Sequence, residues 1–179
     1  MNRLFIAMKL PEDVIGEIDV LRRQIAGNYV PGSWEGIDKL HLTMKFLGDT
    51  DEEKTGEIIN VLEQIATKYS RIYCKTGRFG FFLPRILYLG LEADRHLRQL
   101  AEELNFSFEK LGFQRENRNF KAHITLLRIK KDVSDGFVSD FNNYSLPARE
   151  FYLNELSLMK SWLLPGGSVY TEIKSINLI

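Results

Sequence analysis

The tetrapeptide HLTM occupies residues 41–44, and a near copy of it, HITL, occupies residues 123–126. Both have the order histidine, apolar residue, threonine, apolar residue. Because successive side chains of a β-strand point to opposite faces, each histidine would share a face with its threonine, and the apolar residues would share the other face. The chain contains only three histidines. Two of them in matching tetrapeptides therefore predict a related pair of strands, each with one polar and one buried face.

Elements of the same types precede and follow both tetrapeptides. For the first half, hydrophobic periodicity and turn residues predict strands over residues 4–10, 40–47 and 72–82, a helix that begins at Pro11 and a helix that begins near Asp51. For the second half, they predict strands over residues 86–91, 120–129, 149–162 and 168–177, a helix from Asp94 to about Leu111 and a short helix over residues 132–141. A loop is expected over residues 27–36 and a turn over residues 164–167, where glycine and proline gather.

This repetition of elements predicts the fold class. We expect one α+β domain over residues 1–179, with two pseudo-symmetric lobes that correspond roughly to residues 1–84 and 85–179. Each lobe would be an antiparallel sheet with outer helices, because hairpin-like strand pairs suit antiparallel pairing. A pseudo-twofold axis would then set the two histidine strands face to face across a central cleft, where both imidazoles converge on one ligand.

Composition limits the kind of protein and its partners. Lys and Arg together number 24, as do Asp and Glu, so a contact with a polyanion must come from a local patch of charge. The single cysteine, Cys74, excludes a disulfide within the chain and is expected to be a small core residue in a reducing compartment. The apolar stretch near the N-terminus is too short for a signal peptide, and no run reaches the length of a membrane span. We expect a soluble, monomeric, cytoplasmic protein with no membrane partner.

Two imidazoles on either side of one substrate suit acid–base hydrolysis. An imidazole titrates near neutral pH, so one ring can accept a proton from water while the other donates a proton to a leaving oxygen. Thr43 and Thr125 lie two residues beyond the histidines, where their hydroxyls can bind an anion between the rings, and Lys45 would extend the first polar face. The anion that gains most from such positioned donors is a phosphoester.

At these residues the sequence resembles the 2H (two-histidine) phosphoesterase superfamily, and within it the bacterial and archaeal RNA 2′,3′-cyclic phosphodiesterases, also called 2′-5′ RNA ligase-like proteins. The resemblance covers nearly the whole chain. It rests on the paired tetrapeptides and on the segments RLFIAMKLP, HLTMKFLG, PRILYLG, KAHITLLR and PGGSVY.

The resemblance implies a bilobal fold and a hydrolysis that needs no metal and no cofactor, in which a terminal 2′,3′-cyclic phosphate of RNA opens to a 2′-phosphate. By position, His41 would be the proton donor and His123 the proton acceptor. The partners would be RNA ends or nucleotides that carry the cyclic phosphate, with tRNA fragments as one source. The reverse 2′-5′ ligation would be weak and independent of ATP, and the sequence contains no phosphate-binding P-loop.

The family also has an arginine after the second motif, which Arg128 matches. Strict alternation from His123 and Thr125 places Leu127 on their face and Arg128 on the other. A β-bulge or the end of the strand would have to turn Arg128 back toward the histidines, where its planar guanidinium could bind a phosphate. Otherwise Arg128 is a solvated surface charge, and Lys45 is the alternative anion contact.

Less specific interpretations remain open for each of these residues. A single strand histidine is more often structural than catalytic, and the threonines could simply be good strand formers. A zinc site would need three or four ligands, and no cysteine or carboxylate lies at matching spacing. His96, in a helix, is expected at the surface. The aromatic residues Phe79, Phe81 and Phe82 could stack on a base, but core packing is the favoured interpretation.

Two further functions compete with RNA cyclic phosphodiesterase activity. One is a 2H cyclic phosphodiesterase that acts on a small nucleotide. The other is a module that binds RNA ends without turnover. The neutral net charge favours small ends over long RNA, because extended binding draws on many phosphate contacts.

Overall fold

The computed structural model describes residues 2–165 and 167–179. Its helices are α1 (Glu12–Ala26), α2 (Thr55–Ala66), α3 (Arg95–Lys110) and α4 (Asp135–Asn143), with short 3-10 turns at Ile37–Lys39 and Glu52–Lys54. Its strands are β1 (Asn2–Lys9), β2 (Gly32–Trp34), β3 (His41–Thr50), β4 (Ile72–Phe82), β5 (Ile86–Ala93), β6 (His123–Ile129), β7 (Glu150–Leu153), β8 (Glu155–Leu164) and β9 (Gly167–Asn177). The strands pair antiparallel throughout. The predicted α+β class with antiparallel strands is confirmed.

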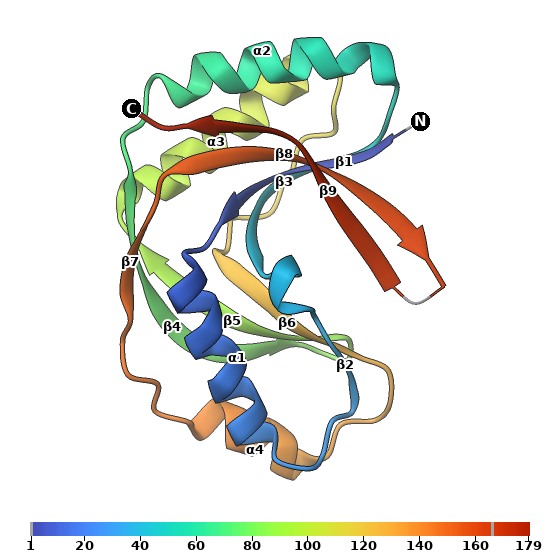
Figure 1. Ribbon diagram of the computed structural model, residues 1–179, viewed down its shortest axis with the longest axis vertical. Helices are drawn as coiled ribbons and strands as arrows, with labels where there is room; N and C mark the ends of the chain where they lie inside the picture. The colour runs from blue at the N-terminus through green and yellow to red at the C-terminus, as the bar shows by residue number, and fades with distance from the viewer. Residues whose placement is uncertain (1, 166) are drawn as a thin grey trace.

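The two histidine strands are neighbours at the centre of the sheet. The strand order is β7-β4-β5-β6-β3-β1-β8-β9, and β2 adds to β6. Within the described residues, β3 and β6 pair at one position, Leu42 with Ile124. We call this position the seam. The sheet curls on either side of it, with β1, β8 and β9 beyond β3, and β5, β4 and β7 beyond β6 (Figure 1).

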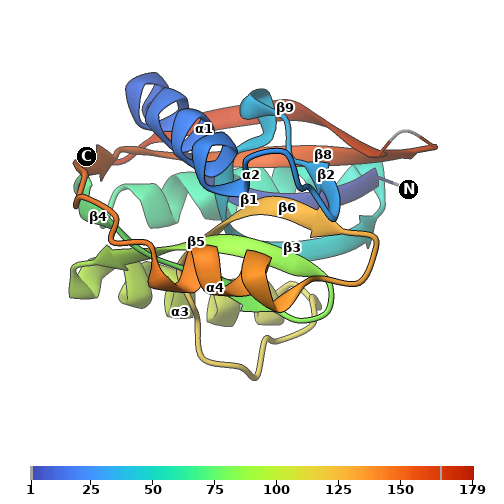
Figure 2. The same ribbon diagram turned by 90° about the horizontal axis from the view of Figure 1, so that it is seen from below.

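The helices form two pairs that cover different parts of the curled sheet. Helices α2 and α3 contact each other, with α2 against β8 and β9 and α3 against β3, whereas α1 contacts α4 and α4 contacts β4. Figure 1 shows the first pair at the top of the molecule and the second pair at the bottom. In Figure 2, seen from below, α1 and α4 lie nearest the viewer. Each pair buries its apolar stripe, as in α3, where Leu97, Leu100, Leu104 and Phe108 are buried.

The structure departs from the sequence-based elements in several places. Residues 32–34 of the expected loop form β2, because β6 offers them a free edge for pairing. Strand β3 continues past Gly48 to Thr50. The single strand expected over residues 149–162 is two strands, β7 and β8, which lie on opposite sides of the seam. The expected turn over residues 164–167 includes Gly166, which lies outside the described residues.

The sides of the sheet do not follow the two sequence halves. Strand β1, from the first half, lies between β3 and β8, and β4, also from the first half, lies between β5 and β7. Each side of the seam therefore combines strands from before and after residue 84. The two halves of the sequence have a similar order of elements, but each half contributes strands to both sides of the seam. The histidine strands also lie side by side in one sheet rather than face to face.

No helix in the described part of the chain is long and apolar enough to cross a membrane.

Candidate active site

A large cleft lies over the seam. Its volume is about 1420 Å³, and its lining includes His41, Thr43, His123 and Thr125. Antiparallel pairing about Leu42 and Ile124 sets His41 on the side of Thr125 and Thr43 on the side of His123. The four polar side chains of the two tetrapeptides thus lie on one face, as alternation predicted, and the apolar residues between them are buried.

The backbone fixes the tautomer of both imidazoles. His41 Nδ1 lies 2.6 Å from the carbonyl oxygen of Lys39, and His123 Nδ1 lies 2.7 Å from the carbonyl oxygen of Lys121. A carbonyl oxygen only accepts hydrogen bonds, so each Nδ1 must carry a proton and donate it. In the neutral ring, Nε2 then holds the free lone pair. His41 Nε2 lies 3.0 Å from Thr43 Oγ1.

The two rings differ in their surroundings. The His41 ring packs edge-on against Tyr170, with 5.4 Å between ring centroids, and lies 5.1 Å from Phe5. Burial lowers the pKa of His41, because it disfavours the charged ring, although the carbonyl of Lys39 and the charge of Glu35 act in the opposite direction. Free His41 is therefore biased toward its neutral form. The His123 ring packs edge-on against Phe82 at 5.1 Å and Tyr88 at 5.5 Å.

A β-bulge follows each histidine–threonine pair. In β6, Tyr88 pairs with Thr125 while Leu87 pairs with Leu127, so Leu126 is the extra residue. In β3, Ala7 pairs with Thr43 and Ile6 with Lys45, so Met44 is the extra residue at the same motif position. A bulge shifts the alternation by one residue. The residue five positions after each histidine, rather than four, therefore returns to the cleft.

In β6 the residue that returns is Arg128. Leu126 and Leu127 are both fully buried, whereas the Arg128 side chain is 52% exposed and lines the cleft. Its Nε donates to Glu35 Oε1. The bulge that the sequence required for Arg128 to face the histidines is present. Its role as a phosphate clamp stays a prediction.

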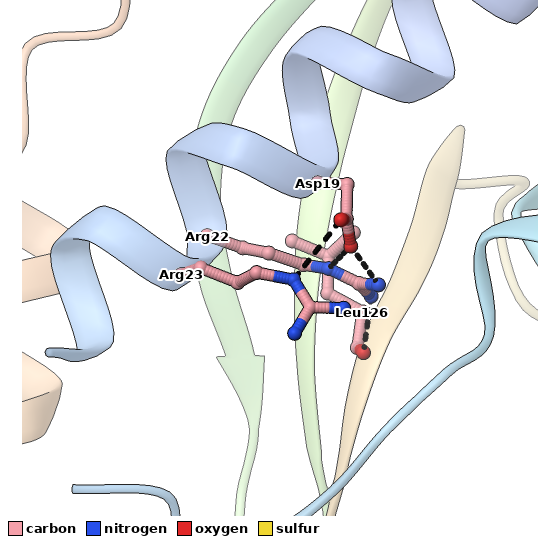
Figure 3. A network of polar contacts seen from close by, with 4 residues as sticks. All are labelled: Asp19, Arg22, Arg23 and Leu126. Carbon is pink, nitrogen blue, oxygen red and sulfur yellow. Dashed lines mark hydrogen bonds and ion pairs between the residues drawn. The ribbon is translucent and has the colours of Figure 1, made fainter. Parts of the chain in front are cut away.

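A buried arginine on α1 holds this bulge. Arg22 is fully buried, and its Nη1 donates to the carbonyl oxygen of the extra residue, Leu126, at 3.1 Å (Figure 3). Its Nε donates to Asp19 Oδ1 at 2.9 Å, and its guanidinium lies over the Trp34 ring. The backbone N–H of Glu35 donates to the same Leu126 oxygen at 2.8 Å. These tertiary contacts satisfy the carbonyl that the bulge takes out of the strand ladder.

In β3 the residue that returns to the cleft is Phe46, which is 63% exposed, and Lys45 is buried at 2% exposure. Lys45 Nζ donates to Asn105 Oδ1 at 2.8 Å and to the carbonyl oxygen of Gln114 at 2.9 Å. Burial lowers the pKa of Lys45, although Glu116 and Glu109 oppose this shift. The bulge at Met44 takes Lys45 out of the simple alternation with His41 and Thr43, and its ammonium contacts α3, although Lys45 still lines the cleft. A role of Lys45 in binding an anion stays a prediction.

Several residues of the cleft were not predicted from the sequence. Lys39 and Lys121 each stand two positions before a histidine, supply the carbonyls that fix the rings, and line the cleft. The repeated spacing Lys-x-His was a signal for them. Glu35 and Tyr170 carried no such signal, because only tertiary pairing brings them to the site. Of the aromatic cluster, Phe79 is core, whereas Phe82 stacks on Tyr88 at the rim of the cleft.

Across residues 2–165 and 167–179, no group of three or more His, Cys, Asp or Glu side chains is placed to hold a metal ion. His96, in α3, is exposed as expected, and Cys74 is buried.

An α+β protein whose two central strands present paired histidines and threonines to one cleft is a two-histidine phosphoesterase in class. The chain belongs to the 2′-5′ RNA ligase superfamily, whose family model matches residues 10–161. A protein of Methanocaldococcus jannaschii named RNA 2′,3′-cyclic phosphodiesterase is 31% identical, and the match covers 96% of this chain and 98% of that protein. A protein of Thermotoga maritima with the same name is 29% identical, over 94% of this chain and 91% of its own length.

Solved structures have the same fold over nearly the whole chain. The protein TT0787 of Thermus thermophilus superposes with a TM-score of 0.83 at 26% identity and covers 98% of this chain and 97% of its own. E. coli LigT complexed with 3′-AMP superposes with a TM-score of 0.80 at 28% identity, over 99% of this chain and 98% of that chain.

Proposed function

We propose that this protein hydrolyses the terminal 2′,3′-cyclic phosphate of RNA to a 2′-phosphate, with His41 as proton donor and His123 as proton acceptor. The observation that carries the proposal is the matched pair of imidazoles that line one cleft: a carbonyl two residues earlier accepts from each Nδ1–H, so Nε2 is the nitrogen of each ring that can exchange a proton with a substrate, and that of His41 also contacts Thr43 Oγ1. The names of the relatives support the same reaction.

The proposed step transfers two protons and exchanges one P–O bond for another. The oxygen of a water molecule attacks phosphorus as His123 Nε2 removes one of its protons. The bond between phosphorus and the 3′ oxygen breaks, and His41 Nε2–H donates a proton to that oxygen. The products are a 3′-hydroxyl and a 2′-phosphate. The histidines end with exchanged protonation states and are reset by proton exchange with water.

His41 must be protonated to act as the donor, whereas burial favours its neutral form. A bound phosphate adds a negative charge beside the ring, and an adjacent opposite charge raises the pKa of an imidazole. We therefore propose that substrate binding raises the pKa of His41, so that the ring is protonated in the complex. Arg128 and the hydroxyls of Thr43 and Thr125 are proposed to bind the non-bridging oxygens, because donors aimed at developing charge lower the barrier.

A second candidate is a cyclic phosphodiesterase that acts on small nucleotides. The LigT structure in complex with 3′-AMP favours it, because a mononucleotide occupies that relative. We propose the RNA end as the main substrate and weak 2′-5′ ligation as its reverse. The single buried thiol, Cys74, suits the reducing cytoplasm proposed as the compartment.

The test uses an RNA oligonucleotide that ends in a 2′,3′-cyclic phosphate, with mass spectrometry and phosphatase sensitivity to identify a 2′-phosphate. We expect His41→Ala and His123→Ala to lower kcat by about 10²- to 10⁴-fold, the usual contribution of a general acid or base. His96→Ala is the control, because that side chain is exposed in α3. Unchanged turnover in both variants, or loss of turnover on chelation with EDTA, would contradict the mechanism. Binding without product would favour an RNA-end binding module.

A further inference from the structure

The cleft is richer in cations than the rest of the molecule. The whole chain has equal numbers of basic and acidic residues. In contrast, eight Lys or Arg residues but only three Glu residues line the cleft, within the described part of the chain. Low-dielectric walls focus the field of such a cluster, so the cleft attracts anions although the net charge is zero. The mechanism above uses only Arg128 among these cations.

A group of the unused cations lies on one wall, formed by α3 and the segment that follows it. Arg98 comes from α3, and Arg115, Arg118 and Lys121 come from residues 115–121. We call these four residues the basic wall. The wall is continuous with the histidines, because Lys121 supplies the carbonyl that binds His123 Nδ1.

Polar contacts between α3, Lys45 and residues 114–116 hold this wall in place. Asn105 of α3 accepts from the backbone N–H of Glu116 at 2.9 Å and donates to its carbonyl oxygen at 2.8 Å. Lys45 donates to Asn105 Oδ1 and to the carbonyl oxygen of Gln114. A buried ammonium is costly unless it is fully hydrogen-bonded. The buried charge of Lys45 therefore helps to fix the segment that carries Arg115 and Arg118.

The cations of the wall differ in how they are engaged. Arg115 pairs with Glu109, and Lys121 lies over the Tyr88 ring. Arg98 and Arg118 are exposed, and neither forms an ion pair with a carboxylate of residues 2–165 or 167–179. These two guanidinium groups are free to bind an external anion.

We propose that the basic wall binds the backbone phosphates of the nucleotides that precede the cyclic end, so that the preferred substrate is an oligonucleotide. This inference rests on the proposed function. A 2′,3′-cyclic phosphate is the 3′ end of its strand, so every other phosphate of that strand lies on its 5′ side. The strand must leave the histidines along a wall of the cleft, and the basic wall offers it positioned cations that face solvent. Lys45 and Asn105 are positioning residues for this wall.

The test compares two substrates with the same terminal nucleotide: adenosine 2′,3′-cyclic phosphate and a short oligonucleotide that ends in it. We expect the oligonucleotide to have the higher kcat/KM. In the double variant Arg98→Gln/Arg118→Gln, kcat/KM for the oligonucleotide should fall about tenfold, through KM, as expected when charge-assisted phosphate contacts are lost. The value for the mononucleotide should not change. The matched control is Arg78→Gln/Arg95→Gln, two exposed arginines outside the cleft lining.

Salt dependence gives a second readout. Each phosphate contact to a single strand contributes about 0.7 to the slope of log affinity against log salt. The double variant should therefore lose about 1.4 from the slope measured for the oligonucleotide. Asn105→Leu should raise KM for the oligonucleotide and expose the Glu116 amide to hydrogen exchange, whereas Asn105→Asp, which keeps the acceptor, should protect that amide.

The outcomes separate the inference from the proposed function. If the wild type turns over neither substrate, the proposed function fails. The alternative outcome is that the wild type turns over both substrates with equal kcat/KM, and that the double variant leaves kcat/KM and the salt slope for the oligonucleotide unchanged. In that case the proposed function stands, and the proposal that the basic wall binds backbone phosphates is overturned.

Discussion

His41 and His123 have the same backbone contact and different surroundings. Both donate Nδ1–H to the carbonyl of a lysine two residues earlier. Burial lowers the pKa of His41, and the positive charges of Arg128 and His123 act in the same direction. The two imidazoles also pack against different aromatic side chains, Phe5 and Tyr170 for His41 and Phe82 and Tyr88 for His123. Two similar tetrapeptides thus place their histidines in unequal surroundings.

The lowered pKa of His41 predicts how stability depends on pH. The unfolded chain has a histidine pKa near 6.5. Because the folded pKa is lower, the unfolded state binds the proton first as pH falls, so the wild type loses stability from about pH 6.5 down through the folded pKa. His41→Gln lacks this titration. We expect the difference in unfolding free energy between wild type and variant to fall between about pH 7.5 and about pH 5, as measured by urea denaturation.

His96→Gln serves as the control for this prediction, since it removes an exposed imidazole and leaves His41 in place. It should lose stability on acidification as the wild type does. An equal loss in His41→Gln and in the wild type would show that burial of His41 does not carry the pH dependence.

At the scale of elements, the paired bulges decide what faces the substrate. They return Arg128 and Phe46 to the cleft, bury Leu127 and direct the Lys45 ammonium to Asn105 and Gln114. In β6 the support comes from α1, through Arg22, and from the segment after β2, through Glu35. Helix α1 thus contributes to the site without touching it.

Arg22→Met tests this support. Breaking a buried ion pair by removing one partner costs about 3–5 kcal/mol, and because Asp19 keeps its contact with Arg23, we expect the lower end of that range in urea denaturation. KM should rise, because Arg128 is less well placed. Asp19→Leu/Arg22→Met should recover much of the stability, since no unpaired charge remains, while KM stays raised. A wild-type KM in both variants would show that the support of the bulge by Arg22 does not affect substrate binding.

Local pattern predicted much of the fold and part of the site. The paired tetrapeptides predicted the family and the antiparallel α+β class, and both are confirmed. Alternation set the histidines and threonines on one face. It did not predict the bulge at Met44, which changes the orientation of Lys45, because a bulge depends on pairing with a strand remote in sequence. It also missed β2 and the exchange of strands between the halves, since edge pairing is decided by the neighbours available in the folded chain. The roles of the site residues stay predictions.

For the whole molecule, the position of the charges matters more than their sum. The formal net charge is 0 and the sequence pI is about 6.8. A protein with evenly mixed charges would pass through a phosphate-bearing cation exchanger at about pH 7.5, above its pI. We expect retention at low salt, because the cations gathered in the cleft contact the resin together.

This retention should shorten in Arg98→Gln/Arg118→Gln and should not shorten in the control pair Arg78→Gln/Arg95→Gln, although both variants lose the same charge. Elution of both variants at the wild-type salt concentration would mean that the cleft is not the contact surface.

The seam between Leu42 and Ile124 sets the spacing of the two histidines. Each catalytic candidate stands one residue from it, His41 on one strand and His123 on the other. Neighbouring antiparallel strands lie about 4.7–4.9 Å apart, so strand pairing fixes the distance between the backbones that carry the acid and the base. A substitution in the outer strands or helices can therefore change the walls of the cleft and leave the spacing of the two histidine backbones unchanged.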